Sequence, residues 1–226
     1  IKMWGVRKLD AEYVARMEAV LQLYSAPSKS AYALVCLDER PVQLHDDVRE
    51  PTRARPGRPA RRDAEYKRRG TANVFAIVAP CLGLHLTHAT KNRKSPSYVR
   101  ALKRIAKAFP KAKKIHLVQD NLSSHSEAAC IRTLGASEGR KLWARFIVHF
   151  TPKHGSWLNI AETEISMWSR ECLGKRRLGE LKVLRTETCA WNRRVNRSKR
   201  RILWKFNVQD ARRKLKLRLV SSSLKH

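Results

Sequence analysis

The feature that most constrains the fold of this chain is a short apolar run that ends in an acid. The run from Ile115 to Val118 is followed at once by Gln119, Asp120 and Asn121, and then by a polar turn. A buried strand of this kind belongs within a sheet, and its last side chains lie at the sheet edge, where they can face a ligand. We therefore treat Asp120 as a candidate functional residue and expect Asn121 to serve the turn or to lie behind the site.

A second apolar run leads to another acid. The run from Tyr32 to Leu37 is compact and is followed directly by Asp38, in a polar stretch that contains Pro41. This pattern predicts a second strand that ends at Asp38. Because both acids follow predicted strands, Asp38 and Asp120 are candidates for one site.

A third acid lies near the start of a predicted helix. Glu162 and Glu164 both flank an apolar stripe at helical spacing, so periodicity does not separate them. Glu162 also follows Asn159 by three residues, which is the spacing of a capping box. In that arrangement the glutamate only accepts a hydrogen bond from the backbone N–H of the asparagine. The pattern leaves two interpretations of Glu162, as a helix cap and as a member of the site.

The rest of the chain alternates between helical and strand-like patterns. These patterns predict a first helix, a hairpin, a crossover helix, a second crossover helix interrupted by glycines, and a further strand. In chain order the segments are residues 10–24, 72–80 with 82–90, 97–109, within 126–145, and 146–150. The predicted fold class is a mixed α/β sheet flanked by helices, with acids at strand ends.

The charge of the chain predicts a polyanionic partner. Lys and Arg total 49 against 19 acids, a net charge of +30, and a balance this positive is typical of nucleic-acid binding. The alternative is a merely solvated basic surface. The five cysteines form no Cys-x-x-Cys pair, which favours reduced thiols over a disulfide framework or a zinc site. Neither a membrane span nor a signal peptide is evident in the sequence.

Two segments carry much of the positive charge. Residues 51–70 contain eight Lys or Arg and three prolines, which predicts a flexible loop, either ordered only against phosphate or an ordinary solvated linker. Residues 175–226 contain 18 Lys or Arg against three acids; we expect their aromatics Trp191, Trp204 and Phe206 to form a small core. The candidate DNA contacts are Arg53, Arg55, Arg58, Arg61, Arg62, Lys153, His154, Arg193, Arg194, Lys199, Arg200 and Arg201.

Three carboxylates on a strongly basic protein predict phosphodiester chemistry. Carboxylate oxygens in small number leave coordination positions open to water and phosphate, as Mg²⁺ or Mn²⁺ requires. Two such ions can assist an in-line displacement at phosphorus. The basic surface would hold the nucleic acid and the acids would hold the metal. A His/Cys zinc site lacks suitable spacing, and His125 and His154 near the acids are candidates only for orienting a carboxylate or touching phosphate.

Several motifs closely resemble the catalytic half of IS630-type transposases, which are relatives of the Tc1/mariner group. The resemblance extends from near Met3 to about Leu217. It is carried by Leu-Val-Cys-Leu-Asp-Glu at 34–39, Arg-Arg-Gly-Thr-Ala-Asn-Val-Phe at 68–75, Leu-Val-Gln-Asp-Asn-Leu-Ser-Ser-His at 117–125, Thr-Pro-Lys-His-Gly-Ser-Trp-Leu-Asn-Ile-Ala-Glu at 151–162, and the closing segments 204–206 and 210–215.

This resemblance implies a ribonuclease H-like fold and a DDE site made of Asp38, Asp120 and Glu162. It also implies Mg²⁺ or Mn²⁺, two ions, as cofactors, and double-stranded DNA as the partner, both as element ends and as a target with a short TA-containing sequence. The resemblance further implies a homodimer, and a location in the cytoplasm or at the nucleoid of a prokaryotic host. The implied domains are a helical lead-in (1–30), the catalytic domain (31–174) and a basic C-terminal helical extension (175–226).

The implied reaction is hydrolysis at the element ends followed by attack of the freed 3′-hydroxyl on target DNA. Full members of the family carry N-terminal helix-turn-helix domains that this sequence does not include, so we expect a fragment, or a decayed or repurposed copy. Two alternatives remain open at this stage. A structure-selective nuclease would use the same three acids, and a noncatalytic DNA-binding protein would retain them as relics or helix caps.

Overall fold

The computed structural model describes residues 9–26 and 32–217. Seven α-helices and six strands lie within these ranges, with two short helical turns of other type. In chain order they are α1 (Ala11–Ser25), β1 (Tyr32–Asp47), β2 (Tyr66–Ala79), β3 (Leu84–His85), β4 (His88–Thr90), α2 (Ser95–Ala108), β5 (Lys114–Gln119), α3 (Glu127–Leu134), α4 (Ala136–Trp143), β6 (Phe146–Phe150), η1 (Ser156–Leu158), α5 (Ala161–Trp168), η2 (Ser169–Leu173), α6 (Leu181–Arg197) and α7 (Val208–Lys214).

The strands form one mixed sheet in the order β3-β2-β1-β5-β6, with β4 also beside β2. The pairs β1–β2, β2–β3 and β2–β4 are antiparallel, whereas β1–β5 and β5–β6 are parallel. The helix α2 crosses over to β5, and α3 with α4 crosses over to β6, as parallel strands require. The predicted hairpin, both crossover helices and the mixed sheet are thus confirmed, with the second crossover broken at Gly135.

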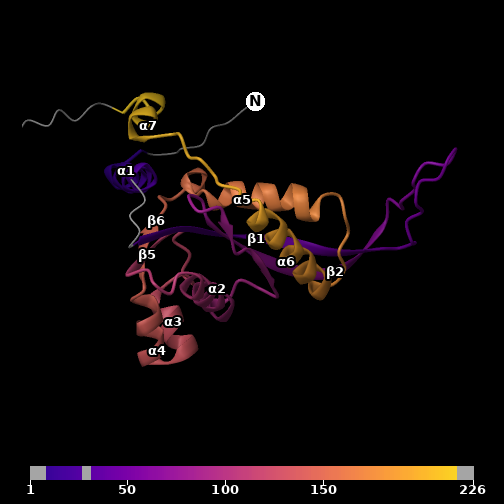
Figure 1. The fold of residues 1–226 in the computed structure, drawn as a ribbon, viewed down its shortest axis with the longest axis horizontal. Coiled ribbons are helices and arrows are strands. Elements are labelled where there is room, and N and C mark those ends of the chain that lie inside the picture. The colour runs from indigo at the N-terminus through magenta and orange to yellow at the C-terminus, as the bar shows by residue number, and fades with distance from the viewer. Residues whose placement is uncertain (1–8, 27–31, 218–226) are drawn as a thin grey trace, which may run out of the picture.

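Helices cover both faces of the sheet (Figure 1). On one face α2, α3 and α4 cover side chains such as Val35, Leu37 and Leu117. On the other face Cys36 and Val118 pack with α1, α7 and the start of α5, while the later part of β1 packs with α5, η2 and α6. Successive residues of a strand therefore alternate between the two cores, and this alternation decides which face each acid meets.

The aromatic residues of the C-terminal segment belong to these cores, as the sequence predicted. Trp191 is buried between α6 and the sheet. Trp204 and Phe206 are half-buried against α1 and the sheet, and Trp204 lies 5.4 Å from Tyr24, centroid to centroid. The ion pair of Arg212 with Glu18, at 2.6 Å, joins α7 to α1. None of the described helices combines the length and apolar composition that a membrane-spanning helix needs.

The prediction that the first strand ends at Asp38 is wrong, because β1 continues to Asp47. Its pairing with β5 stops at Cys36, but its antiparallel pairing with β2 runs on past Asp38 to the end of the strand. From Leu37 onward β1 has a partner on one side only, and a strand with a free side tolerates Pro41. The polar residues Asp38, Glu39 and Arg40 therefore lie within the strand and do not mark its end.

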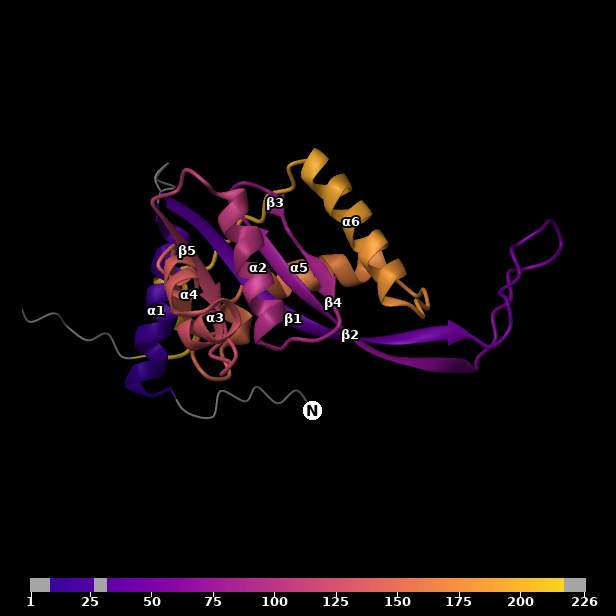
Figure 2. The ribbon, with the colours of Figure 1, turned by 90° about the horizontal axis from the view of Figure 1, so that it is seen from below.

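The predicted loop between Pro51 and Gly70 is shorter than expected, because Tyr66 to Gly70 belong to β2 and pair with the end of β1. Residues 48–65, which we call the arm, continue the hairpin of β1 and β2 and project away from the helices (Figures 1 and 2). Isolated bridges pair Thr52 with Arg61 and Arg55 with Arg58. Pro56 and Gly57 lie between the last two, and Gly57 has a φ of 74°, which suits the third position of a type II turn. Backbone pairing thus orders a segment whose side chains are almost all exposed.

The base of the arm is held to the segment before α6. The guanidinium of Arg62 binds Asp47 through two hydrogen bonds, of 2.7 and 2.9 Å, and also donates to the carbonyl of Lys175. Arg177 donates to Asp47 at 2.8 Å and to the carbonyls of Ala64 and Glu65. Arg62, one of the predicted DNA contacts, therefore has a structural partner of opposite charge.

Close packing of α3 against α4 generates a stability prediction. A Cβ atom added at Gly139 would lie 2.6 Å from the Cα of Ile131. Gly139→Ala should therefore lower the free energy of unfolding by about 1–2 kcal/mol, because overpacking outweighs the better helix propensity of alanine. Urea denaturation measures the change. Ser137→Ala, at an exposed position of the same helix, is the control, and equal stability of the two variants would contradict the prediction.

Candidate active site

Asp38 and Asp120 each follow the parallel pairing of β1 and β5 by two residues. In this pair Cys36 is the partner of Val118, and both side chains pack against α1 and the start of α5. Asp38 lies within β1, so its side chain points to the same side as that of Cys36. Asp120 directly follows β5, and its Oδ1 atom contacts His125.

The helix α5 is anchored next to Asp38 by Asn159. The buried amide of Asn159 donates to the carbonyl of Leu37 at 2.8 Å, and its oxygen accepts from the backbone N–H of Ala161 at 3.1 Å. The backbone N–H of Asn159 donates to Ser156 instead of to Glu162. The capping-box interpretation of Glu162 is therefore wrong, because the backbone N–H of Asn159 already donates to the carbonyl of Ser156 and not to the carboxylate of Glu162.

The structure separates the two glutamates that periodicity could not. Glu164 is fully buried and accepts hydrogen bonds from Thr87 and His85, each at 2.7 Å. His85 also contacts the carbonyl of Arg200 at 2.9 Å, so Glu164 ties α5 to the sheet and to the segment after α6. Glu162 lies exposed on the first turn of α5, and its charge acts on Asp38.

The electrostatics of Asp38 show that these acids form a cluster. Burial, and to a smaller extent the nearby charges of Glu162, Asp120 and Glu39, raise the pKa of Asp38 to about 7, whereas a hydrogen bond from the backbone N–H of Glu39 opposes the shift. That bond measures 2.8 Å. The structure thus places Glu162 and Asp120 near enough to Asp38 for their charges to act on it.

His125 and Glu39 join the cluster from the opposite side. The Nδ1 atom of His125 lies 2.8 Å from Oδ1 of Asp120, and its Nε2 atom lies 2.5 Å from Oε1 of Glu39. Burial opposes the charge on the ring, but the two carboxylates prevail and raise the pKa of His125 to about 9. Burial would likewise raise the pKa of Asp120, but the hydrogen bond and charge of His125 hold it below its usual value.

Glu39 is the residue of this cluster that sequence reasoning missed. It follows Asp38 and so faces the other side of β1, where α2 and the turn after β5 lie. The only signal in the sequence was the pair of adjacent acids at 38 and 39. That pair does not reveal that a histidine 86 positions later lies against the second acid.

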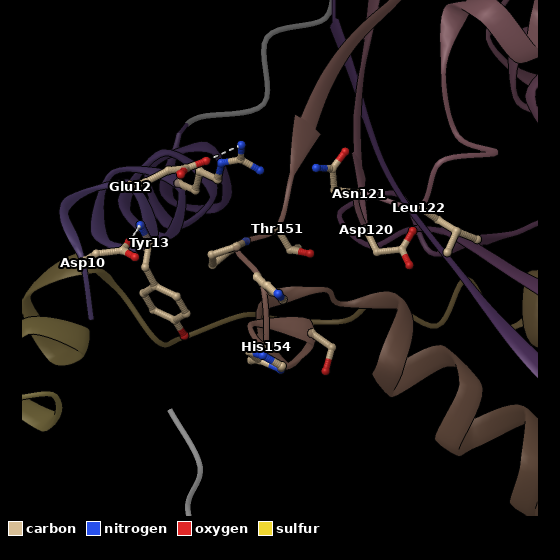
Figure 3. A pocket seen from close by; sticks show the side chains of 12 residues that line it. Asp10, Glu12, Tyr13, Asp120, Asn121, Leu122, Thr151 and His154 are labelled. Atoms are coloured by element: carbon tan, nitrogen blue, oxygen red, sulfur yellow. Dashed lines mark hydrogen bonds and ion pairs between the residues drawn. The ribbon is translucent and has the colours of Figure 1, made fainter. Parts of the chain in front are cut away.

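An open pocket of about 750 Å³ lies beside Asp120 (Figure 3). Its wall combines the start of α1, the turn after β5 and the loop after β6, including Lys153 and His154. Asn121 also lines it and is exposed, in keeping with a place in the turn. Asp38 and Glu162 do not line this pocket, so it adjoins the acid cluster from one side only.

The acid cluster has the donor chemistry that a divalent cation of the Mg²⁺ type requires. It offers carboxylate oxygens, the hard ligands that Mg²⁺ and Mn²⁺ prefer. The side chain of Asp120 is 42% exposed, so it can be reached from solvent, and part of the raised pKa of Asp38 comes from neighbouring negative charge that a cation would relieve. Asp38, Asp120 and Glu162 are therefore of the ligand type that such a cation needs, but among the described residues the group of three whose ligand atoms lie within 4.8 Å of one another is Glu39, Asp120 and His125.

The other predicted DNA contacts lie in three places. Besides Arg62, four of them are on the arm, two are in the pocket beside Asp120, and five are on α6 or just after it. Arg194 and Arg200 form ion pairs with Glu171, and Arg62 pairs with Asp47. The remaining nine are exposed and have no ion-pair partner among the described residues: Arg53, Arg55, Arg58, Arg61, Lys153, His154, Arg193, Lys199 and Arg201.

Comparison with known proteins gives a family match and a fold match. Residues 33–185, more than half of the chain, match the family described as "DDE superfamily endonuclease". This range contains all three predicted acids. No curated protein matches the chain by sequence.

Two crystal structures of the Mos1 mariner paired end complex, one with Mn and one with Mg, resemble this chain. Each superposes with a TM-score of 0.54 at 15% sequence identity over 88% of this chain. The chain spans 62% of the length of the first and 60% of the second. A likeness at this identity concerns the fold, and it confirms the ribonuclease H-like arrangement of the sheet and its flanking helices.

The raised pKa of Asp38 predicts a pH-dependent stability. The folded state holds this proton up to about pH 7, whereas the unfolded chain releases it near the ordinary aspartate pKa of 3.8. Stability of the metal-free protein is therefore lost as pH rises through this window, by up to about 4 kcal/mol for Asp38 alone. Asp38→Asn should raise the unfolding midpoint near pH 8 and change it little near pH 4, measured by thermal denaturation in a chelator.

The exposed Glu50→Gln is the control for the loss of one negative charge. An equal gain from Asp38→Asn at both pH values would show that the proton on Asp38 does not cause the effect.

Proposed function

The chain belongs to the DDE superfamily endonucleases, and from this premise we propose that it is the catalytic domain of an IS630-type DNA transposase that cuts DNA strands and transfers them. The observation that supports the proposal is the action of the charges of Asp120 and Glu162 on Asp38. Asp38 lies in β1, Asp120 directly follows β5, and Glu162 comes from α5, which Asn159 anchors to the carbonyl of Leu37.

The three carboxylates of the cluster would hold two Mg²⁺ or Mn²⁺ ions. The family membership and the titles of the similar Mos1 complexes, which name Mn and Mg, support this choice. Bound metal ions of this kind supply activation of the attacking oxygen and stabilisation of the leaving oxygen in phosphodiester chemistry. The chain itself supplies the fixed oxygen ligands, and Lys153 and His154 in the pocket beside Asp120 would bind the phosphate of the strand to be cut.

Double-stranded DNA is the partner that the charge and the shape favour. The arm projects four exposed arginines with no ion-pair partner among the described residues, and α6 with the segment after it adds further exposed cations. Such charges bind the phosphate backbone irrespective of sequence. The similar Mos1 structures are paired end complexes. Binding of element ends, a TA-containing target, assembly as a homodimer and action at the nucleoid belong to the same proposal.

Removing one metal ligand tests the catalytic part of the proposal. Asp120→Asn should lower Mg²⁺- or Mn²⁺-dependent nicking of supercoiled DNA by more than about a hundredfold, because even substitutions behind the ligands cost up to that factor in metal sites. DNA binding should be retained, since the change removes a negative charge. Glu138→Gln on α4, outside the cluster, is the control and should nick normally. Wild-type protein that binds DNA but nicks it with neither metal would instead support a noncatalytic DNA-binding function.

A donor duplex with a free 3′-hydroxyl end distinguishes a transposase from a structure-selective nuclease. The proposed function predicts joined products in which the donor strand is covalently attached to target DNA. A nuclease that uses the same acids would yield only cuts.

The arm generates a separate prediction about salt dependence. Each phosphate contact contributes about 0.9 to the slope of log affinity against log salt. Replacing Arg53, Arg55 and Arg58 together by alanine should therefore make the slope shallower by about 2 to 3, measured by filter binding of a duplex. The triple lysine variant, which keeps the charges, is the matched control. An unchanged slope in the alanine variant would exclude the arm from the DNA contacts.

A further inference from the structure

A buried histidine links two acids that belong to neighbouring strands. The side chain of His125 has no exposed surface. One ring nitrogen contacts Asp120, at the end of β5, and the other contacts Glu39, on β1. Glu39 is adjacent to Asp38 in sequence, and its side chain is 3% exposed. The contact Glu39–His125–Asp120 is therefore a closed bridge behind the acid cluster.

Besides the two carboxylates, a neighbouring aromatic ring and backbone hydrogen bonds hold His125 in place. It stacks on Tyr98 of α2 with centroids 4.3 Å apart and an interplanar angle of 21°. The hydroxyl of Tyr98 donates to Gln119 at 2.8 Å, and the amide of Gln119 donates to the carbonyl of His125 at 3.2 Å. The backbone N–H of His125 donates to Leu122 at 2.8 Å. The imidazole is thus held in one orientation by α2 and by the strand that carries Asp120.

Glu39, Asp120 and His125 place three ligand-type atoms within 4.8 Å of one another, but this geometry argues against His125 as a metal ligand. Both ring nitrogens already lie against carboxylate oxygens, so neither has a lone pair directed at an open site. The contact instead occupies one oxygen of Asp120, while the side chain as a whole stays 42% exposed. The second oxygen is the one left for a cation.

The structure assigns to His125 the function of a positioning residue that fixes the carboxylate of Asp120 for metal binding and braces it, through Glu39, against the strand that carries Asp38. This assignment rests on the proposed function, because it concerns the metal ligands of the proposed site. Residues that orient a metal ligand in this way typically change metal affinity by about 10- to 100-fold when they are replaced.

Three substitutions separate the two contacts of the ring. In His125→Asn the side-chain amide occupies the place of Nδ1 and keeps a donor toward Asp120. In His125→Gln the amide reaches the place of Nε2, toward Glu39, and the donor to Asp120 is lost. His125→Ala removes both contacts. The design therefore compares side chains that differ in which acid they can hold.

Mn²⁺ binding, followed by the electron paramagnetic resonance signal of free Mn²⁺, is the readout. Asp120→Asn defines the Mn²⁺ that belongs to this site. We expect His125→Asn to weaken that binding by less than about threefold, and His125→Gln and His125→Ala to weaken it by about 10- to 100-fold. Nicking by the Gln variant should recover largely at saturating Mn²⁺, because a misplaced ligand raises the metal requirement more than it lowers the maximal rate.

His88→Asn is the matched control. His88 is also buried and stacked on an aromatic ring, that of Phe75, with centroids 5.5 Å apart, but among the described residues no carboxylate lies within ion-pair distance of its ring nitrogens. Its replacement should lower the thermal midpoint without changing Mn²⁺ affinity. A purely structural role of His125 would instead make Mn²⁺ affinity follow the thermal midpoint across all variants.

Wild-type affinity in His125→Gln, or equal weakening by all three substitutions, would overturn the assignment. So would wild-type protein that binds no Mn²⁺ sensitive to Asp120→Asn. If the expected order of affinities is found but the wild-type protein does not nick DNA, the positioning function stands and the proposed catalytic function fails.

Discussion

The parallel pairing of β1 with β5 is the constraint on which the rest of the site depends. Its last pair, Cys36 with Val118, lies two residues before Asp38 and Asp120, and the two-residue repeat of a strand sends Asp38 to the face that α5 covers. The same repeat sends Glu39 and Gln119 to the opposite face, where Tyr98 and His125 lie. One backbone pairing therefore separates the residues that face the proposed metal site from the residues that support it. A shift of register by one residue would exchange the two sets.

This arrangement concentrates negative charge in a protein that is strongly positive overall. The net charge of +30 is spread over exposed side chains, where solvent and salt weaken its influence. The acids of the cluster are nearer to one another and partly removed from water, so their mutual repulsion is screened much less. This repulsion adds to the larger effect of burial in raising the pKa of Asp38. His125 relieves part of this repulsion on one side of the sheet, and a cation would relieve it on the other.

Local pattern was sufficient to predict the order of the elements and the two strands that carry the aspartates. Periods of two and 3.6 residues reflect which side chains are buried, and burial here follows one sheet with helices on both faces. The sequence pattern did not predict strand ends correctly where pairing with a distant strand determines how far a strand extends. Nothing local distinguishes a polar strand end from a polar paired arm, so β1 beyond Asp38 and the arm itself were not foreseen.

The same limit applies to the side chains of the site. Glu162 and Glu164 flank one apolar stripe, and only the contacts of Glu164 with His85 and Thr87 show which of them is part of the core. The resemblance to a transposase family favoured Glu162 over Glu164. In the structure Glu164 is buried in the core, whereas Glu162 is exposed. Glu39 remained unnoticed because its partner His125 comes from a distant part of the sequence, and such a contact exists only after the sheet has formed.

The length of β1 sets the distance between the acid cluster and the base of the arm. A single strand carries Asp38 near its middle and reaches the base of the arm at Asp47. Nine residues at about 3.3 Å each separate these two points by roughly 30 Å, which is close to nine steps of about 3.4 Å along a DNA strand. Antiparallel pairing with β2, with a register shift between Leu44 and His45, and the ion pairs of Asp47 hold this span. Under the proposed function, a duplex bound by the arm would therefore meet the acids at a set distance along its axis.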